Sequence, residues 1–349
     1  MTGEKDAPPL PKASAWPHAW LAVGIVVLLA VSFASLVAGT SELSVPALLR
    51  ALAAGPAAGS STAATILWGV RMPRLLAALL CGCALSCSGL LLQAALDNSL
   101  AAPSVMGVNS GAGLLCLVAG LVAPYSAAAR QLGSFAGAML AALLVFAVSR
   151  RAGTGKTTLV LAGVAVSSLM SAGIDAIVTV RPDVVTDRVS FTLGSVAGVS
   201  YSQLAAAVVP VAACLVPAFL IGVGVDSLAL GDEVAHGLGV NVRAYRLGAL
   251  AIAALLAASA VSVCGLVSFL GLIVPNVVRL RLRCGLRGRL AACAVWGAAF
   301  LALCDLVART VLYPYELPVG LVLSLLGAPF FIMLLVRRHH GFGGGGLGA

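Results

Sequence analysis

Two adjacent carboxylates, Asp232 and Glu233, stand in a glycine-flanked run at residues 230–240. In the first turn of a short helix, these side chains would be favoured by the positive end of the helix dipole. Gly237 or Gly239 can then adopt the left-handed conformation that commonly ends a helix. Such a segment is either an amphipathic connector between two longer helices or a docking element for a partner protein.

Motifs for catalysis are missing from the sequence. It contains neither His-Glu-x-x-His nor Gly-x-Ser-x-Gly, and the four histidines lie at the ends of apolar runs or between them. The tract GTGKTT at 153–158 looks like a phosphate-binding loop, but Arg150 stands where that motif requires its first glycine. We therefore expect no catalytic residue, no cofactor and no nucleotide site in this chain.

Cysteines are a second class of residue that could bind a ligand, and the chain has nine of them. Cys81, Cys83 and Cys87 cluster in one apolar run, but their spacing places the first two on different faces of a helix. All nine except Cys284 fall within apolar runs. The sequence predicts small packing residues and no metal site.

The elements that carry these residues are membrane helices. The 349 residues are 61% hydrophobic and 9% charged, with a mean hydropathy of +1.09, which leaves too little polar surface for a soluble protein of this size. Uncharged or nearly uncharged windows long enough to cross a bilayer predict an all-α integral membrane protein with about ten spans. The windows are 19–38, 75–96, 104–123, 132–149, 159–180, 204–225, 247–264, 265–278, 290–312 and 317–336.

The distribution of cations predicts the orientation. Most of the 21 lysines and arginines fall on one side if the N-terminus is inside, which makes both termini cytoplasmic and the number of spans even. The transmembrane domain would occupy 18–338, between disordered tails at 1–17 and 339–349. An amphipathic helix at 40–54 would lie on the outer face. The net charge of +9 indicates contact with anionic lipid headgroups and not with nucleic acid.

An internal similarity predicts an inverted repeat. Ala84, Ser86, Gly89 and Leu90 recur with the same spacing near residue 260, and the two helices would run in opposite directions. Inverted repeats with broken helices are typical of transporters, and breaks are tolerated only where protein or water satisfies the freed carbonyl groups. The second set is Ala260, Ser262, Gly265 and Leu266.

Several motifs resemble the permease subunits of type II ABC importers, which take up iron-siderophore complexes, haem and vitamin B12. Similar to that family are the run 230–240, the Arg-x-Pro-Arg stretch at 71–74, and the stretches 98–112, 269–279 and 316–330. The resemblance covers residues 18–338. Its helix-break and pathway positions are Asn98, Pro103, Gly107, Gly111, Pro275, Asn276, Glu316, Pro318 and Gly327.

The resemblance implies a mechanism and a set of partners. Two permease subunits, identical or related, would enclose one pathway in a bacterial cell membrane, and a cytoplasmic ATPase dimer holding ATP and Mg²⁺ would drive it. The coupling segment would span about 228–242. Its contact residues would be Leu230, Gly231, Asp232, Glu233, Ala235, Leu238 and Gly239.

The same resemblance implies an outer docking pocket. Arg71, Arg74 and Arg309 would bind acidic residues of a substrate-binding protein, because a guanidinium grips a carboxylate with two hydrogen bonds. The alternative is that Arg309 merely pairs with Asp305, one helical turn away. The chain departs from the family at Ser99, where proline is usual, and at Asn276, where histidine is usual.

Two rival functions belong to other classes. An ion-coupled secondary transporter would carry acidic or histidine relays at mid-membrane depth, but these spans are almost empty of titratable groups. Asp175 is the remaining acid within a span, and it is expected toward the outer half of its helix, where solvent can reach it. A membrane enzyme would need the missing catalytic motifs. The cargo is not encoded in these motifs, and a ferric siderophore is the first expectation, with haem and cobalamin as alternatives.

Overall fold

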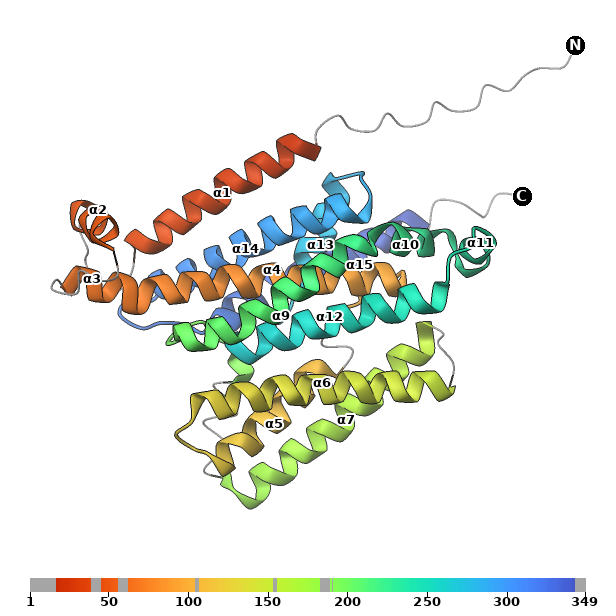
Figure 1. Cartoon of the computed structure of the whole chain (residues 1–349), viewed down its shortest axis with the longest axis horizontal. Helices are drawn as coiled ribbons and strands as arrows, with labels where there is room; N and C mark the ends of the chain where they lie inside the picture. Colours follow the sequence, from red (N-terminus) through yellow and green to blue (C-terminus); the bar gives the residue numbers. More distant parts are fainter. Residues whose placement is uncertain are drawn as a thin grey trace, which may run out of the picture.

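The computed structural model describes residues 17–38, 45–55, 62–103, 107–152, 156–182, 189 and 191–342, and every regular element in these ranges is helical. Figure 1 shows the arrangement. The elements are α1 (Pro17–Val37), α2 (Val45–Ala54), α3 (Thr62–Ile66), the π-helical turn η1 (Leu67–Arg71), α4 (Met72–Leu96), α5 (Val108–Val122), α6 (Ala127–Ala152), α7 (Lys156–Val180), α9 (Tyr201–Leu220), α10 (Gly222–Ser227), the 3₁₀ turn η4 (Leu228–Leu230), α11 (Asp232–Gly237), α12 (Val242–Cys264), α13 (Leu270–Arg281), α14 (Leu286–Thr310) and α15 (Val319–Phe342).

Helix α4 is the centre of the bundle and packs against α12, α13 and α14. Glycines allow these close approaches: a Cβ on Gly89 would lie 1.8 Å from the carbonyl oxygen of Gly271, and one on Gly82 would lie 2.3 Å from that of Gly297. Lipid tails are as apolar as the surfaces of these helices, so the hydrophobic effect does not drive the helices together in a bilayer. Close packing of their backbones does so instead. The small residues of α4 therefore determine how closely its neighbours pack.

Helices α4 and α12 are antiparallel over their whole length. Cys81 Sγ lies 3.6 Å from the carbonyl oxygen of Ala260, and Ser88 Oγ donates to the carbonyl of Ala253 at 2.6 Å. Arg246 Nε then donates to the carbonyl of Ala95 at 3.1 Å. The opposite directions of the two helices agree with the internal similarity, while an inverted repeat of the whole bundle stays a prediction.

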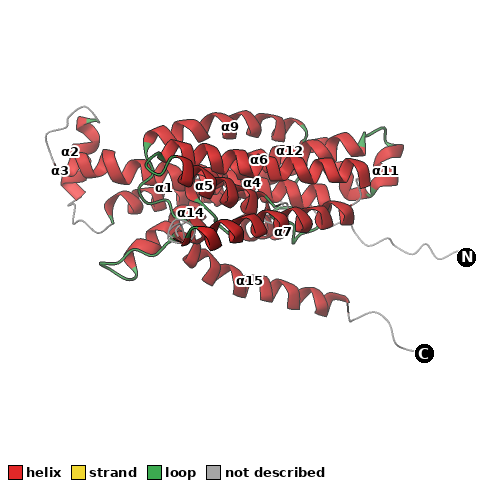
Figure 2. Ribbon diagram, turned by 90° about the horizontal axis from the view of Figure 1, so that it is seen from below, coloured by secondary structure: helices red, strands yellow, loops and turns green. Residues whose placement is uncertain are grey.

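Other helices surround this centre. Helices α5, α6 and α7 form a group that packs on α12 through α6 (Figure 1). Helix α1 lies along α14, and α15 stands at the edge of the molecule, where Figure 2 shows it apart from the main bundle. The apolar side chains of α15 that point outward, such as Leu325 and Ile332, lack partners within the described part of the chain and must face lipid or another protein.

The bundle has two distinct ends. Helices α2 and α3 lie at one end, and α11 lies at the other end, toward which the start of α1 and the end of α15 also point (Figures 1 and 2). We name them the α2 end and the α11 end. This arrangement agrees with two termini on one side and with 45–54 on the opposite side, and the assignment of the α11 end to the cytoplasm stays a prediction from the cations.

Seven described helices are long and apolar enough to cross a membrane. Each of the ten expected windows overlaps at least one helix, but two of these helices are short: α5 has 15 residues and α13 has 12. Helix α13 is therefore only about 18 Å long, too short to cross a bilayer alone. The chain is a multi-pass membrane protein, and the count of ten spans stays a prediction. The seven are His18–Val37, Thr62–Leu96, Ala127–Val148, Thr157–Val180, Tyr201–Leu220, Val242–Cys264 and Leu286–Thr310.

Three expected boundaries differ from the structure. The window 204–225 is broken after Leu220, where α9 ends and α10 begins, and Arg287 Nε satisfies the freed carbonyl of Phe219 at 2.8 Å. Helix α15 continues to Phe342, past the expected start of the tail at 339, and Pro17 already belongs to α1. The tails at 1–16 and 343–349 lie outside the described residues.

Candidate functional site

The segment that contains α11 forms a compact projection at its end of the bundle. Gly231, with φ +97°, separates η4 from α11, and Gly239, with φ +80°, ends it. The N–H of Gly239 donates to the carbonyl of His236 at 2.9 Å and that of Val240 to the carbonyl of Ala235 at 3.0 Å, which is the Schellman pattern. Of the two glycines that could end this helix, Gly239 is therefore the one that does so.

The exposed side chains of this projection are apolar as well as charged. Ala235 is fully buried and fixes α11 against the bundle, whereas Glu233 is exposed. Leu230, Val234 and Leu238 are each more than half exposed, at 58%, 53% and 64%. An apolar surface rimmed by charge at the end of a bundle is suited to contact with another protein.

A buried arginine fastens α11 to two long helices. Arg246, at the start of α12, is 3% exposed and binds Asp232 with both terminal nitrogens of its guanidinium. Its Nη2 donates to Oδ1 at 2.6 Å and its Nη1 donates to Oδ2 at 3.1 Å. Its Nε binds the carbonyl of Ala95 at the end of α4. Sequence reasoning did not single out Arg246 from the other cations, because its two partners, Asp232 and Ala95, lie on other elements.

A second ion pair closes the same end. Asp226 accepts hydrogen bonds from the backbone N–H of Leu286 at 2.6 Å and from Arg289 Nη2 at 2.7 Å, so α10 is tied to the start of α14. Burial raises the pKa of the neighbouring Cys284 thiol, and the positive charge of Arg289 partly offsets this. The projection thus rests on a rigid base made from several helix ends.

At the α2 end, the predicted arginines gather around a buried carboxylate. Arg74 binds Asp305 with Nε and Nη2, each at 2.9 Å from Oδ1, and binds Glu316 with Nη1 at 2.7 Å. Asp305 is 1% exposed, and Arg309 Nε lies 3.6 Å from its Oδ2. The pair of Arg309 with Asp305 is therefore present, but Arg74 is the main partner of that carboxylate.

Arg71 and Arg309 also satisfy the C-terminal carbonyl groups of α1. Arg71 Nη1 donates to the carbonyls of Leu36 and Val37, the latter at 2.8 Å, and Arg309 Nη2 donates to that of Ser35 at 2.6 Å. The last carbonyls of a helix have no partner within it, and cations are favoured at that end. These arginines therefore have a structural role in this conformation.

The burial of these arginines bears on the expected docking pocket. Arg71, Arg74 and Arg309 are only 4%, 8% and 4% exposed, so the structure brings them together without presenting them to a partner. Docking through these arginines stays a prediction that requires a rearrangement. Glu316, expected among the helix breaks, lies instead in this cluster and has the most exposed side chain of the network, at 34%.

The helix-break residues meet between α4 and α13. Asp97 ends α4 in the left-handed conformation, and Asn98 Oδ1 accepts the N–H of Leu100 at 3.0 Å. Asn276 Nδ2 donates to the carbonyl of Ser99 at 2.9 Å and to that of Leu272 at 2.8 Å. The two positions at which the sequence departs from the family pattern are therefore in direct contact.

A residue in the left-handed conformation stands directly before each of the two neighbouring helices, α5 and α13. Gly107, with φ +72°, precedes α5, and Phe269, with φ +65°, precedes α13, whose interior contains Pro275. Close contacts seal this region: a Cβ on Gly271 would lie 3.4 Å from Pro103, and one on Gly327 would lie 2.4 Å from the ring of Phe269. The cavity between Pro103, Asn109 and Phe269 measures only about 20 Å³. Two further expected residues are Gly111, packed on Gly137, and Pro318, directly before α15.

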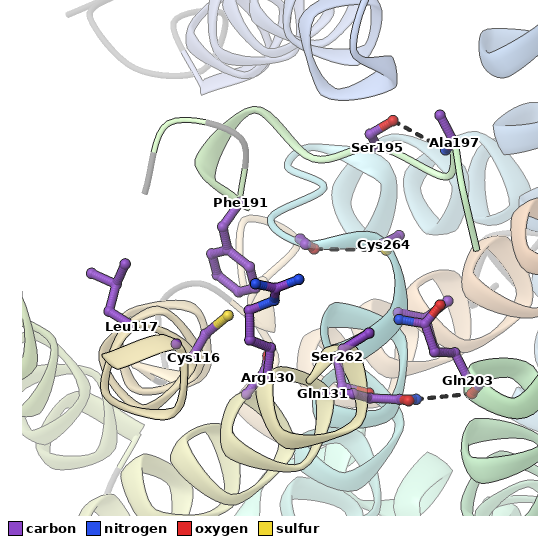
Figure 3. A pocket seen from close by; sticks show the side chains of 15 residues that line it. Cys116, Leu117, Arg130, Gln131, Phe191, Ser195, Ala197, Gln203, Ser262 and Cys264 are labelled. Atoms are coloured by element: carbon purple, nitrogen blue, oxygen red, sulfur yellow. Dashed lines mark hydrogen bonds between the residues drawn. The ribbon is translucent and has the colours of Figure 1, made fainter. Parts of the chain in front are cut away.

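A larger cavity of about 310 Å³ opens at the α2 end, among the C-terminal halves of α5 and α12 and the starts of α6 and α9 (Figure 3). Arg130, Gln131 and Ser134 of α6 line one side of it, and Gln203 and Ser262 line the other. Gln131 Nε2 donates to the carbonyl of Gln203 at 2.8 Å and so joins α6 to α9. Sequence reasoning assigned no role to any of these residues.

Together the long apolar helices, the left-handed breaks inside the bundle and the exposed projection at one end define a multi-pass membrane transport protein. The chain belongs to the FecCD transport family, whose model matches residues 27–337. It is therefore a permease of the class that the motifs at 71–74, 230–240 and 316–330 indicated.

Characterised relatives support the same assignment. The hemin transport system permease protein HmuU of Yersinia pestis is 35% identical over 281 residues, 77% of this chain and 83% of that protein. The vitamin B12 import system permease protein BtuC of Vibrio cholerae is 38% identical over 81% of this chain and 86% of that protein. The iron(3+)-hydroxamate import system permease protein FhuB of Bacillus subtilis is 38% identical over 81% of this chain and 74% of that protein.

The fold is shared with a solved transporter. A metal-chelate type ABC transporter in an inward-facing conformation matches with a TM-score of 0.80 and 25% identity, over 91% of this chain and 98% of that chain. The likeness therefore extends over most of the chain.

Proposed function

We propose that this chain is the permease subunit of an ATP-driven importer that carries an iron chelate across a bacterial cell membrane. It would pair with a second permease subunit, receive cargo from an extracytoplasmic substrate-binding protein and be driven by a cytoplasmic ATPase dimer. Family membership and the names of the relatives support this assignment. A ferric siderophore is the proposed cargo, with haem, another iron chelate, and cobalamin, a cobalt complex, as the alternatives.

The observation that carries the proposal is the geometry of α11. This short helix projects from the bundle, exposes Glu233 and three apolar side chains, and is fastened through Asp232 and Arg246 to the ends of α4 and α12. ATP and Mg²⁺ would be held by the partner ATPase. The tract that resembles a phosphate-binding loop lies partly outside the described residues, and its last part begins α7.

The same geometry supports a mechanism of alternating access. A partner that displaces α11 would pull on Arg246 and therefore on the ends of both α4 and α12. Helix α4 contacts α13 at Gly89 and, just beyond its end, through the Ser99–Asn276 hydrogen bond. Because α13 is short and begins at a left-handed residue, it can tilt without breaking a long helix. The closed region beside Pro103 would then open toward one side of the membrane at a time.

Reconstitution tests the proposal. The permease, its cognate ATPase and a cargo-loaded binding protein are placed in liposomes, and ATP-dependent uptake of labelled ferric siderophore is measured. Glu233→Arg should reduce uptake at least about tenfold, because reversing one exposed interface charge typically costs 1–2 kcal/mol or more. Glu233→Gln, which keeps the size of the side chain, should retain most of the activity.

The choice of Glu233 matters, because Asp232→Arg would also break the ion pair with Arg246 and so confuse folding with coupling. Normal uptake by Glu233→Arg would contradict docking at α11. Uptake that persists without nucleotide and follows an imposed proton or sodium gradient would instead establish the alternative function, an ion-coupled secondary transporter.

A further inference from the structure

The cavity lined by Arg130 has the chemistry of an anion site. Arg130 is the only charged residue among those that line it, and none of the salt bridges among the described residues includes it. Its Nη1 donates to the carbonyl of Pro124 at 2.9 Å, which holds the side chain in place and leaves its other N–H groups available. Figure 3 shows the guanidinium beside Phe191 and Cys116, within the cavity.

The position of Arg130 in its helix strengthens the local positive potential. It lies in the first turn of α6, where the N–H groups and the helix dipole already favour negative charge. A cation at this end is unfavourable unless an anion is nearby. An acidic group bound beside Arg130 would pair with the guanidinium and would also interact favourably with the positive end of the α6 dipole.

A buried hydroxyl at the cavity wall lacks a hydrogen-bond partner. Ser134 is 1% exposed and lies one helical turn beyond Arg130, and its Oγ has no partner within the described structure. Buried polar atoms are nearly always satisfied in proteins, so an unsatisfied hydroxyl next to a cavity points to a ligand or a bound water. The Oγ has almost no surface open to the cavity, so a change of χ1 rotamer has to turn it toward the ligand. The side chains of Gln131 and Gln203 are already held by hydrogen bonds: Gln131 Nε2 donates to the carbonyl of Gln203, and Gln203 Oε1 accepts the N–H of Ser200.

The size of the cavity limits the ligand. About 310 Å³ lies at the lower bound of small-molecule sites, so it can admit one arm of a large chelate but not the whole molecule. Its place at the end opposite α11 is where cargo would enter from a binding protein. We infer that this cavity is a subsite for a carboxylate of the incoming cargo, bound by Arg130 and Ser134.

This inference rests on the proposed function and makes it more specific. The substrate class would be chelates that carry a free carboxylate, such as carboxylate siderophores or the propionates of haem, in preference to neutral hydroxamates. A charge-assisted pair between a guanidinium and a carboxylate supplies this discrimination, because a neutral arm would leave the guanidinium unpaired.

Direct binding tests the subsite without transport. The full chain in phosphatidylcholine nanodiscs is titrated with citrate, a tricarboxylate, by isothermal titration calorimetry. Arg130→Gln should weaken citrate binding at least tenfold, and Ser134→Ala should weaken it about threefold or more. Arg130→Lys should be intermediate, because it keeps the charge but not the forked geometry. Arg50→Gln is the matched control, since Arg50 is an exposed arginine at the same end that also donates to a backbone carbonyl.

The outcomes separate the sources of an anion. Equal citrate affinity in the unaltered chain, Arg130→Gln and Ser134→Ala would overturn the subsite. Inorganic phosphate that binds as tightly as citrate would overturn the assignment to a carboxylate. Phosphatidylglycerol that co-purifies with the unaltered chain, is lost in Arg130→Gln and abolishes citrate binding would identify a lipid site instead. If citrate binds through Arg130 but ATP-driven uptake is absent, the importer function fails while the subsite stands.

Discussion

Single residues at the α2 end illustrate how one side chain can serve two needs. Arg74 neutralises the buried carboxylate of Asp305 and the half-buried one of Glu316, while Arg71 and Arg309 satisfy carbonyl groups at the end of α1. Unpaired charge buried in a protein is costly, and removing one member of such a pair leaves the other uncompensated. The network is therefore needed for stability even if the arginines later bind a partner.

This leads to a prediction about Asp305. Replacement by Asn removes the carboxylate that faces Arg74 and Arg309, and breaking a buried pair costs about 3–5 kcal/mol. Thermal unfolding of purified Asp305→Asn in detergent should show a clearly lower midpoint than the unaltered chain. Glu316→Gln is the control in the same network, and its partial exposure should limit the loss to about 1 kcal/mol or less. Equal unfolding midpoints for the two variants would contradict the prediction that Asp305 contributes more to stability than Glu316 does.

At the scale of elements, glycine contacts determine how the helices pack. Gly89→Ala would place a Cβ within 1.8 Å of the carbonyl oxygen of Gly271, and backbone atoms cannot yield there without moving α4 away from α13. The variant should show a sharp drop in folded protein on size-exclusion chromatography. Gly248→Ala, also inside a helix but with nothing near its Cβ, should fold normally. Unimpaired folding of Gly89→Ala would show that α4 and α13 are not held at this contact.

The helices themselves could be predicted from the sequence, whereas several contacts between them could not. Local patterns predicted α2, the glycine-ended α11 and nearly every long helix, because hydrophobic periodicity and capping act within a few residues. The contact of Arg246 with Ala95 and that of Asn276 with Ser99 join residues far apart in the chain, so no local spacing could indicate them. The π-helical turn at Leu67–Arg71 was also missed, since its residues have no distinguishing composition.

At the scale of the whole molecule, the orientation of the bundle in the membrane can be tested by labelling one residue at each end. Tyr125, fully exposed between α5 and α6, lies at the α2 end, and His236 is exposed on α11. Tyr125→Cys should react with a membrane-impermeant maleimide in intact cells, whereas His236→Cys should react only after lysis. The unaltered chain measures the background from native thiols, chiefly Cys116 in the cavity wall at the α2 end and Cys284 at the α11 end. The raised pKa of Cys284 lowers its reactive thiolate fraction. The reverse labelling pattern would invert the assigned topology.

The hydrogen bond from Asn276 to the carbonyl of Ser99 has an evolutionary consequence. A proline at position 99 would restrain the backbone that carries this acceptor, and a histidine at position 276 would reach it with a longer, differently placed donor. Substitution at either site alone should be disfavoured. Lineages should therefore inherit the two residues as a pair, serine with asparagine or proline with histidine, and frequent mixed pairs in a broad alignment would show that the sites evolve independently.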